Sequence, residues 1–483
     1  MNYQTSIGLE VHVQLLTRSK LFCGCSTQFG SSPNSQTCPV CLGLPGVLPS
    51  INKKAVEYTI LTALALSCKV SSFSRFARKN YYYPDLPKNF QISQYDEPLA
   101  KDGYLEFELD GKSRRVRIQR VHLEEDAGKI IHGEEIQNPE DKDSSFIDYN
   151  RTGIPLMEIV SYPEIHSPEE AYQYLVNLKR VLGYLEVSDC NMEEGSLRCD
   201  ANISLAPEGR RLGVKTELKN MNSFKEIREG LASEIERQAA LLHKGEKVVQ
   251  ETRLWDSHEQ ATIPMRSKEE AHDYRYFPEP DLLPLKVSQG WMRSVKEAVV
   301  ELPFHRYQRF ISEYHLPPYD AGVLTDSREL ADYFEECVRN FPHPKVVSNW
   351  IMGEFLRLVK KETGSLQKIK IKPLMLAHLL EEVEKGVISG KLAKEVFQKM
   401  FQSGRSAEEI IRQEKLGQIS DEGKLEEIIQ RVMMQSLKAV DDFKKGKDKA
   451  LIFLVGQVMR ETKGRANPDL VNRLLKEKMG VRE

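Results

Sequence analysis

The sequence predicts an α+β protein, in which an N-terminal domain built on an antiparallel sheet with a polar face is followed by all-α helical and tail domains. The chain has 483 residues, too many for one hydrophobic core. Up to about residue 285 it consists of short runs in which apolar and polar residues alternate between Gly, Pro and Asn. Beyond about residue 295, long charged amphipathic stretches replace them. We therefore expect domains at residues 1–294, 295–412 and 413–483.

Helix signals support this division. Ser167–Glu170 combines an N-cap serine, a proline at the first helical position and a capping-box glutamate, and Gly183 is suited to end the helix. Further helices are expected over residues 56–66, from a capping box at Ser406 with Glu409, and from Asn467-Pro468 near the end.

Composition excludes a few classes of protein. The formal net charge is -2, so a role with nucleic acid would need a local basic surface. No apolar run approaches the roughly 20 residues that span a bilayer. The first residues, Met1–Ser6, lack the basic segment of a secretory signal and the Arg-rich bias of a transit peptide. We expect a cytoplasmic protein that makes no membrane contact.

Polar residues alternate with apolar ones in four runs. Leu9–Leu15 has polar residues at even positions, and a strand turns alternate side chains to one face, so Glu10, His12 and Gln14 share a face. In the other runs the polar face carries His122 and Glu124; Arg198, Asp200, Asn202 and Ser204; and Lys215, Glu217 and Lys219.

Such a face has the groups needed for phosphoryl transfer. Carboxylates with a histidine can hold Mg²⁺ or Mn²⁺, while Arg and Lys can neutralise phosphate oxygens. The sequence has no Walker-type glycine loop, so a P-loop enzyme is excluded. Antiparallel sheets often have one solvated, charged face, and periodicity alone leaves that alternative open.

Four of the eight cysteines are grouped. Cys23 and Cys25 are followed, after twelve residues, by Cys38 and Cys41. This spacing favours a structural zinc site with four thiolates over four reduced cysteines packed as small apolar residues. A closed site of this kind has no catalytic role.

The segment Lys79–Lys88 mixes basic residues with aromatic ones, namely Tyr81, Tyr82 and Tyr83. A loop of this composition can stack on bases and contact phosphates, or it can be an ordinary packed surface loop.

Eight motifs together resemble the B subunits of bacterial glutamyl/aspartyl-tRNA amidotransferases, in order, in spacing and over essentially the whole length. They are Gly8–His12, Tyr83–Lys88, His122–Asp126, Asn150–Leu156, Arg198–Asn202, Lys215–Asn220, Tyr276–Leu282 and the pattern from Gly456 to Pro468.

The resemblance implies a subunit of a three-subunit enzyme that repairs misacylated Glu-tRNA(Gln) or Asp-tRNA(Asn). This subunit would bind the tRNA and phosphorylate the side-chain carboxylate with ATP. Ammonia from the glutaminase (A) subunit would then form the amide, and a small C subunit would brace the contact. The chain lacks a Ser-Ser-Lys amidase site, so it cannot make its own ammonia.

The resemblance also implies the site residues. The family's catalytic site maps onto Glu10, His12, Glu124, Glu125, Asp200 and Glu217, with Mg²⁺ (or Mn²⁺) at Glu10, His12, Glu125, Asp200 and Glu217. We expect the nucleotide to contact Lys79, Lys88, Arg198, Lys215 and Lys219, and the tRNA to contact Tyr81, Tyr82, Tyr83, Lys463 and Arg465. Many relatives lack the four cysteines, so zinc is a feature of a subtype.

The tail favours RNA binding. From Lys438 to Arg482, twelve Lys and Arg face six Asp and Glu. A solvated basic helical surface is the ordinary alternative, and the resemblance favours a module that recognises the tRNA body by shape.

Two other functions remain as alternatives for the whole chain: a zinc-stabilised tRNA-binding scaffold, and a stand-alone metal-dependent nuclease or phosphatase.

Overall fold

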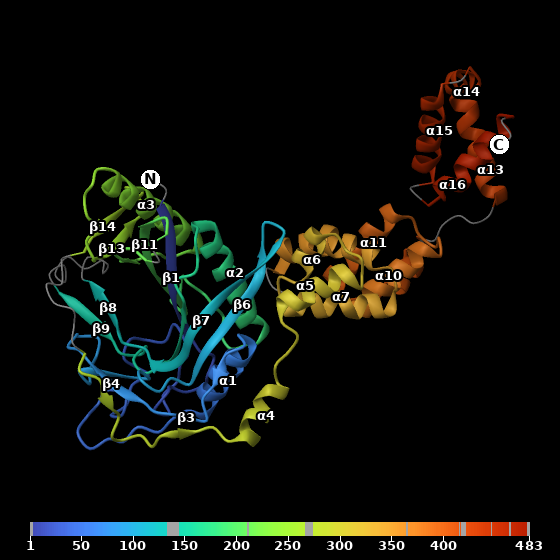
Figure 1. The fold of residues 1–483 in the computed structure, drawn as a ribbon. Coiled ribbons are helices and arrows are strands. Elements are labelled where there is room, and N and C mark those ends of the chain that lie inside the picture. The colour runs from blue at the N-terminus through green and yellow to red at the C-terminus, as the bar shows by residue number, and fades with distance from the viewer. Residues whose placement is uncertain are drawn as a thin grey trace. The chain divides into compact units, whose positions relative to one another are not determined.

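The computed structural model describes residues 3–132, 144–209, 212–265, 274–363, 366–414, 416, 422–445, 447–462 and 465–480. The chain forms two compact units, Met1–His305 and Arg306–Glu483. The described part of the first contains the strands and helices α1 to α4, and the described part of the second is helical (Figure 1). The predicted α+β class is confirmed.

The first unit is built on a nine-stranded sheet with the order β14-β13-β12-β11-β1-β10-β7-β6-β2. Neighbouring strands pair antiparallel, except that β12 and β13 are parallel. The bounds are β1 Tyr3–Gln14, β2 Lys69–Val70, β6 Ala100–Leu109, β7 Lys112–Glu125, β10 Pro155–Ser161, β11 Leu197–Pro207, β12 Thr216–Lys219, β13 Thr252–Asp256 and β14 Ala261–Pro264.

Three smaller sheets are also present among the described residues of this unit. They are β15-β4-β5, β16-β3 and β8-β9. Their bounds are β3 Phe73–Ser74, β4 Ala77–Asn80, β5 Phe90–Ser93, β8 Lys129–His132, β9 Ser145–Asp148, β15 Phe277–Pro278 and β16 Leu285–Lys286.

Helices cover the apolar face of the large sheet (Figure 1). Helix α1 (Lys53–Ala65) contacts β7, α2 (Pro168–Tyr184) contacts β6, and α3 (Phe224–His243) contacts β11. Ile7, Leu9, Val11 and Val13 of β1 are at most 1% exposed in this core, so the alternation in the sequence sets which face of β1 is buried. The short helix α4 (Gln289–Glu297) contacts α1.

The predicted helix starts are confirmed with small differences. Ser167 caps α2 by accepting a hydrogen bond from the Glu170 backbone, and α2 continues one residue beyond Gly183. The Glu170 carboxylate accepts from the backbone of His166 instead of Ser167, so the reciprocal half of the capping box shifts by one residue. Helix α1 starts three residues earlier than expected, because Asn52 caps it.

The described part of the second unit has two separate hydrophobic cores. One includes residues from Phe310 to Ile411, and the other residues from Leu425 to Met479. The division at residues 294 and 412 stays a prediction, and Val295 packs in the core of the first unit. The bounds are α5 Pro303–Ser312, α6 Pro318–Leu324, α7 Arg328–Asn340, α8 Pro344–Trp350, η3 Ile351–Phe355, α9 Leu356–Leu358, η4 Val359–Thr363, η5 Leu366–Lys368, α10 Pro373–Glu384, α11 Gly390–Ser403, α12 Ala407–Gln413, α13 Glu422–Gln435, α14 Leu437–Lys444, α15 Asp448–Glu461 and α16 Pro468–Lys478.

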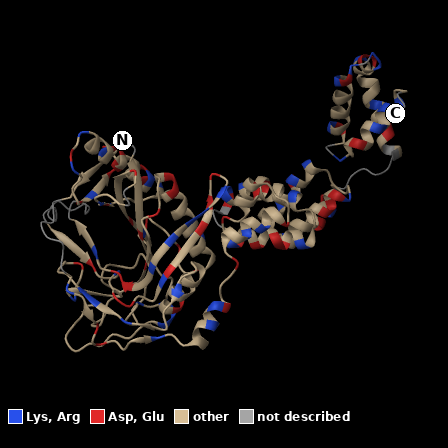
Figure 2. Cartoon of the chain, in the orientation of Figure 1, with Lys and Arg blue, Asp and Glu red and all other residues tan. Residues whose placement is uncertain are grey.

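Capping in the second unit follows the sequence. Ser406 and Glu409 form the complete capping box of α12, and Asn467 caps α16 with Pro468 at its first position. Lys, Arg, Asp and Glu are interspersed along the helices (Figure 2). None of the described helices has the length and apolar character needed to cross a membrane.

Candidate active site

The sheet register gathers the polar side chains of the central strands on one face. Glu10 of β1 lies opposite Asp200 of β11. His12 lies between Arg198 of β11 and Glu158 of β10. Directly opposed residues on neighbouring strands point to the same face. The other members of this acidic face are His122 and Glu124 of β7, opposite Glu158 and Leu156, and Glu217 of β12, opposite Asn202.

Glu158 is the centre of this face, and it is buried. Its Oε2 lies 3.2 Å from Nε2 of His122 and 3.6 Å from Nε2 of His12, and its Oε1 lies 3.3 Å from Nη2 of Arg120. Sequence reasoning missed Glu158. The signal was one acid inside the otherwise apolar run of β10, because a charge in a buried strand needs partners.

The protonation of this cluster follows from its partners. Burial opposes the charge of Glu158, but His122 and His12 outweigh it and hold its pKa well below the ordinary value. Burial also opposes a proton on His122, yet Glu158 and Glu124 raise its pKa to about 9. Near neutral pH, Glu158 is therefore an anion against a positively charged His122.

Glu10 differs, because burial and the neighbouring Glu158 raise its pKa to about 7. Ligand atoms of Glu10, His12 and Glu158 lie within 4.8 Å of one another, as do those of His122, Glu124 and Glu158. Carboxylate oxygens with an imidazole suit Mg²⁺ or Mn²⁺. A divalent cation would favour the ionised form of Glu10, so this donor set fits such an ion.

Asp200 and Glu217 lie at the end of the acidic face that also carries lysines, and we call this the basic end. Nζ of Lys219 lies 2.6 Å from Oδ2 of Asp200 and 3.3 Å from Oε1 of Glu217. Thr252 donates a 2.9 Å hydrogen bond to the other oxygen of Glu217, and Lys215 donates to Asn202 at 3.3 Å. Burial disfavours the charge on Lys219, but the two carboxylates outweigh it and raise its pKa.

Arg198 is held in place by Asp126, which directly follows β7. Its Nη2 donates to Oδ1 of Asp126 at 2.9 Å, while Gln14 donates to Oδ2 at 2.7 Å. Asp126 is buried, and these partners keep its pKa low against the effect of burial. Asp126 was absent from the predicted site, although it follows Glu125 directly.

Glu125 ends β7 and is outside both three-residue groups of candidate metal ligands found among the described residues. It pairs with Lys88 and accepts a 2.9 Å hydrogen bond from the backbone of Ile92. Glu124 instead accepts 2.9 Å from the hydroxyl of Ser93. Because neighbours in a strand point to opposite sides, only Glu124 lies on the acidic face.

In the segment Lys79–Lys88, one tyrosine ring packs on a neighbouring ring and two are exposed. Tyr81 packs edge-to-face on Tyr274 at a centroid distance of 6.0 Å, and Nζ of Lys79 lies 4.8 Å from the Tyr274 ring centroid. Tyr82 and Tyr83 are 81% and 57% exposed.

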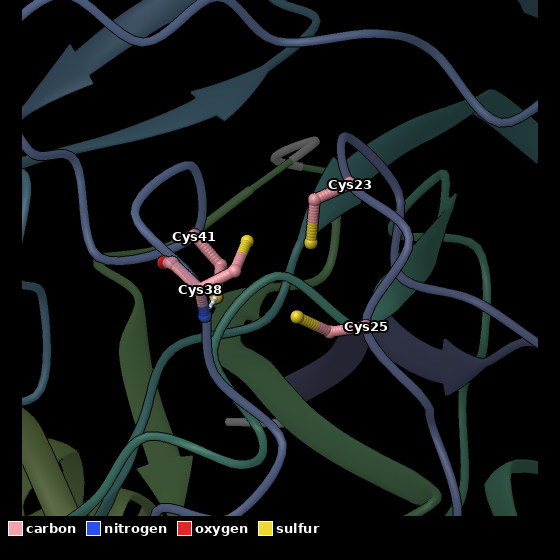
Figure 3. A group of neighbouring side chains, drawn as sticks. All are labelled: Cys23, Cys25, Cys38 and Cys41. Carbon is pink, nitrogen blue, oxygen red and sulfur yellow. Dashed lines mark hydrogen bonds between the residues drawn. The ribbon is translucent and has the colours of Figure 1, made fainter.

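The four grouped cysteines converge. Their thiols point toward one another (Figure 3), and the sulfur atoms lie within 4.8 Å of one another. Tetrahedral Zn–S bonds of about 2.3 Å need sulfurs roughly 3.8 Å apart, so the cluster fits zinc. Of the four cysteines only Cys41 is buried, so the cluster is not an ordinary part of the hydrophobic core. The buried Lys20 places Nζ 3.7 Å from Sγ of Cys41 and supplies a compensating charge.

In the tail, Arg465 is partly buried and donates to the carbonyl of Thr462 at 3.3 Å. Lys463 lies outside the described residues.

Comparisons with known proteins show the family of the chain. The profile of the GatB/GatE catalytic domain matches residues 5–293, and that of the GatB domain matches residues 332–479. The chain belongs to the GatB family. A relative from Carboxydothermus hydrogenoformans is 55% identical over 479 residues, covering 99% of each chain. One from Caldanaerobacter subterraneus is 55% identical over 480 residues, covering 99% of this chain and all of the relative.

Both relatives are named as the B subunit of an aspartyl/glutamyl-tRNA(Asn/Gln) amidotransferase. The resemblance found in the motifs is confirmed, and the chain is an amidotransferase subunit of the tRNA-dependent type.

In this GatB chain, the cysteine loops adjoin Glu125. A cavity of about 220 Å³ is lined by Cys23, Cys41, Gly43, Lys88 and Glu125, among other residues. Gly43 has a φ of +67°, and a Cβ there would overlap the side chain of Lys88. The loop that carries Cys41 therefore packs directly on the Lys88 stem.

Gly43→Ala should displace Lys88 and lower the transamidation rate about 10- to 100-fold, because small misplacements of site groups cost that much. Gly46→Ala is the matched control: its φ of +86° imposes similar backbone strain, but nothing lies within 4 Å of the added Cβ. Rates and thermal midpoints would be measured for both. Equal rate losses in the two variants would show that the Lys88 contact is irrelevant.

Proposed function

We propose that this chain binds misacylated Glu-tRNA(Gln) or Asp-tRNA(Asn), phosphorylates the side-chain carboxylate with ATP, and transamidates it to give Gln-tRNA(Gln) or Asn-tRNA(Asn). The observation that carries the proposal is the acidic face. In a chain of the GatB family, it places two carboxylate–histidine groups beside a lysine–carboxylate cluster, on five adjacent strands.

The reaction would proceed in two displacement steps, phosphoryl transfer followed by amide formation. A carboxylate oxygen of the aminoacyl group attacks the γ-phosphorus of ATP, and ADP leaves. Ammonia then attacks the acyl carbon, phosphate departs with that oxygen, and a proton is lost from nitrogen. A divalent ion, when bound, would neutralise charge on the phosphates.

The chain's own residues would hold the reactants in place. Lys219 and Arg198 are fixed by Asp200 and Asp126, so their charges are already oriented and little reorganisation is needed when phosphate arrives. Lys215 on the neighbouring strand would add a third cation. Among the other expected nucleotide contacts, Lys88 faces Glu125 and Lys79 lies over Tyr274, so we assign these two to the aminoacyl side.

Glu10, His12 and Glu158 would bind Mg²⁺ or Mn²⁺, with Glu124 next to them. The pairing of Glu158 with His122 keeps Glu158 ionised, so its negative charge would be available to the ion. Asp200 and Glu217, which both contact Lys219, would offer further carboxylate oxygens to a divalent ion. We retain Glu125 as a catalytic residue in contact with Lys88, outside the metal group.

Ammonia would come from a partner glutaminase (A) subunit, and a small C subunit would brace the heterotrimer in the cytoplasm. Support comes from the relatives' name, which describes one component of a larger enzyme, and from the missing amidase motif. The basic tail, including Lys463 and Arg465, would bind the tRNA body. Tyr81, Tyr82 and Tyr83 would lie near its acylated end.

Replacing Asp200 or Glu217 by Ala should lower ATP hydrolysis stimulated by misacylated tRNA at least about 100-fold in the reconstituted heterotrimer, because charge stabilisation of the phosphoryl group is lost. Affinity for tRNA should be nearly unchanged. Glu108→Ala, an exposed acid of β6, is the control and should keep full activity. Normal transamidation of both misacylated tRNAs by Asp200→Ala and Glu217→Ala would refute the site assignment.

We also propose that Cys23, Cys25, Cys38 and Cys41 bind one structural Zn²⁺. Elemental analysis of protein purified without added metal should find one zinc per chain. Cys38→Ser should lose the zinc and lower the thermal midpoint, because the bound metal contributes folding energy. Cys190→Ser removes a buried thiol outside the cluster and should leave the zinc content unchanged. Zinc-free reduced wild-type protein would count against the site.

A further inference from the structure

Four tyrosines from two distant segments meet beside the sheet β15-β4-β5, and we call them the tyrosine platform: Tyr81, Tyr95, Tyr274 and Tyr276. The rings of Tyr95 and Tyr276 are stacked, with centroids 4.0 Å apart and planes 7° apart. Tyr274 meets Tyr276 edge-on at 6.1 Å and Tyr81 at 6.0 Å. The four rings therefore form one continuous aromatic surface.

The outer member of the platform faces solvent. Tyr95 is 61% exposed although one face of its ring lies on Tyr276, so its exposed area is mostly the opposite face and the edge. A ring placed in this way buries little apolar area and contributes little to the core. An exposed ring on a fixed support is suited to stack a planar ligand.

Backbone hydrogen bonds hold the platform together. The backbone N–H of Asn80, at the end of β4, donates to the carbonyl of Tyr274 at 3.0 Å, and its side chain donates to the carbonyl of Arg275 at 2.9 Å. These contacts fix the segment of Tyr274 and Tyr276 against the loop that contains Tyr81. The platform is thus preorganised, which lowers the entropy cost of binding.

The platform borders the acidic face on its β7 side. Ser93, two residues before Tyr95, donates to Glu124 at 2.9 Å. Ser93 ends β5, and Glu124 lies 3.6 Å from His122, which contacts Glu158, so the segment that leads to Tyr95 adjoins the acidic face. A ligand stacked on Tyr95 would therefore extend toward Glu124 and Glu158.

The opposite end of the acidic face is basic. In the order β12-β11-β1-β10-β7, Lys219 and Lys215 lie on or beside β12, and Glu10 and Glu158 separate them from the platform. Triphosphate oxygens are suited to the basic end. The tyrosine end is suited to a neutral planar group, with Lys79 beside Tyr274 available for a single phosphodiester.

We propose that the tyrosine platform binds the 3′-terminal adenosine of the aminoacylated tRNA, with the base stacked on Tyr95. This inference rests on the proposed function. The aminoacyl group is esterified to the ribose of that adenosine, so stacking the base at one edge of the acidic face places the side-chain carboxylate over it. The terminal bases of tRNA are unpaired, and unpaired bases are recognised by stacking on aromatic side chains.

A double-mutant cycle tests the contact. Binding of intact tRNA and of tRNA lacking its terminal adenosine would be measured with the heterotrimer of wild-type chain and with Tyr95→Leu. Removing the adenosine should weaken wild-type binding on the order of 5- to 150-fold, the range for one stacked base, and should have almost no effect on Tyr95→Leu. Tyr95→Phe should behave as wild type. Tyr319→Leu, 74% exposed on α6, is the control.

The outcomes separate this inference from the function on which it rests. A wild-type complex that binds tRNA but shows equal losses in wild type and Tyr95→Leu would overturn the platform alone. A raised KM for ATP in Tyr95→Leu, with unchanged tRNA binding, would assign the ring to the nucleotide and also overturn it. A wild-type complex without tRNA-dependent ATP hydrolysis would instead refute the proposed function. Thermal midpoints of all variants would exclude loss of folding as the cause.

Discussion

The antiparallel pairing of β1 with β10 and β11 is the constraint on which the rest of the structure depends. Its register places His12 between Glu158 and Arg198, and Glu10 beside Asp200. A shift of one residue would turn Ile7, Leu9, Val11 and Val13 out of the core, so the apolar face fixes the register that aligns the polar face. The same alternation of apolar and polar residues therefore sets both the buried face of β1 and the alignment of the site.

Burying several carboxylates on one sheet carries a large desolvation cost, and the structure offsets it unevenly. Glu158 is paired with two histidines, Asp126 with Arg198 and Gln14, and Asp200 with Lys219. Glu10 has the weakest compensation, and its pKa is raised to about 7. Because Glu10 lacks a comparable positively charged partner, a bound cation at Glu10 would supply the missing compensation.

The strands β1 and β11 could be predicted because each buries one face, and this gave Glu10, His12 and Asp200 their common side. Glu158 was missed because β10 is apolar around it and shows no alternation, so the only signal was a single acid in an apolar run. Alternation along the strand predicts that Glu124 and Glu125 point to opposite faces, whereas the family resemblance assigned both to the catalytic site. The meeting of Tyr95 with Tyr276 depends on the pairing of β4 with β5 and β15, which no local pattern in the sequence specifies.

We propose that the acidic face activates the aminoacyl carboxylate as an acyl phosphate. Labelling that carboxylate with ¹⁸O and analysing the inorganic phosphate released during transamidation tests it directly. With the wild-type heterotrimer, one carboxylate oxygen per turnover should appear in phosphate, and Glu10→Gln should abolish this transfer. Unlabelled phosphate from an active wild-type complex, or undiminished transfer with Glu10→Gln, would contradict it.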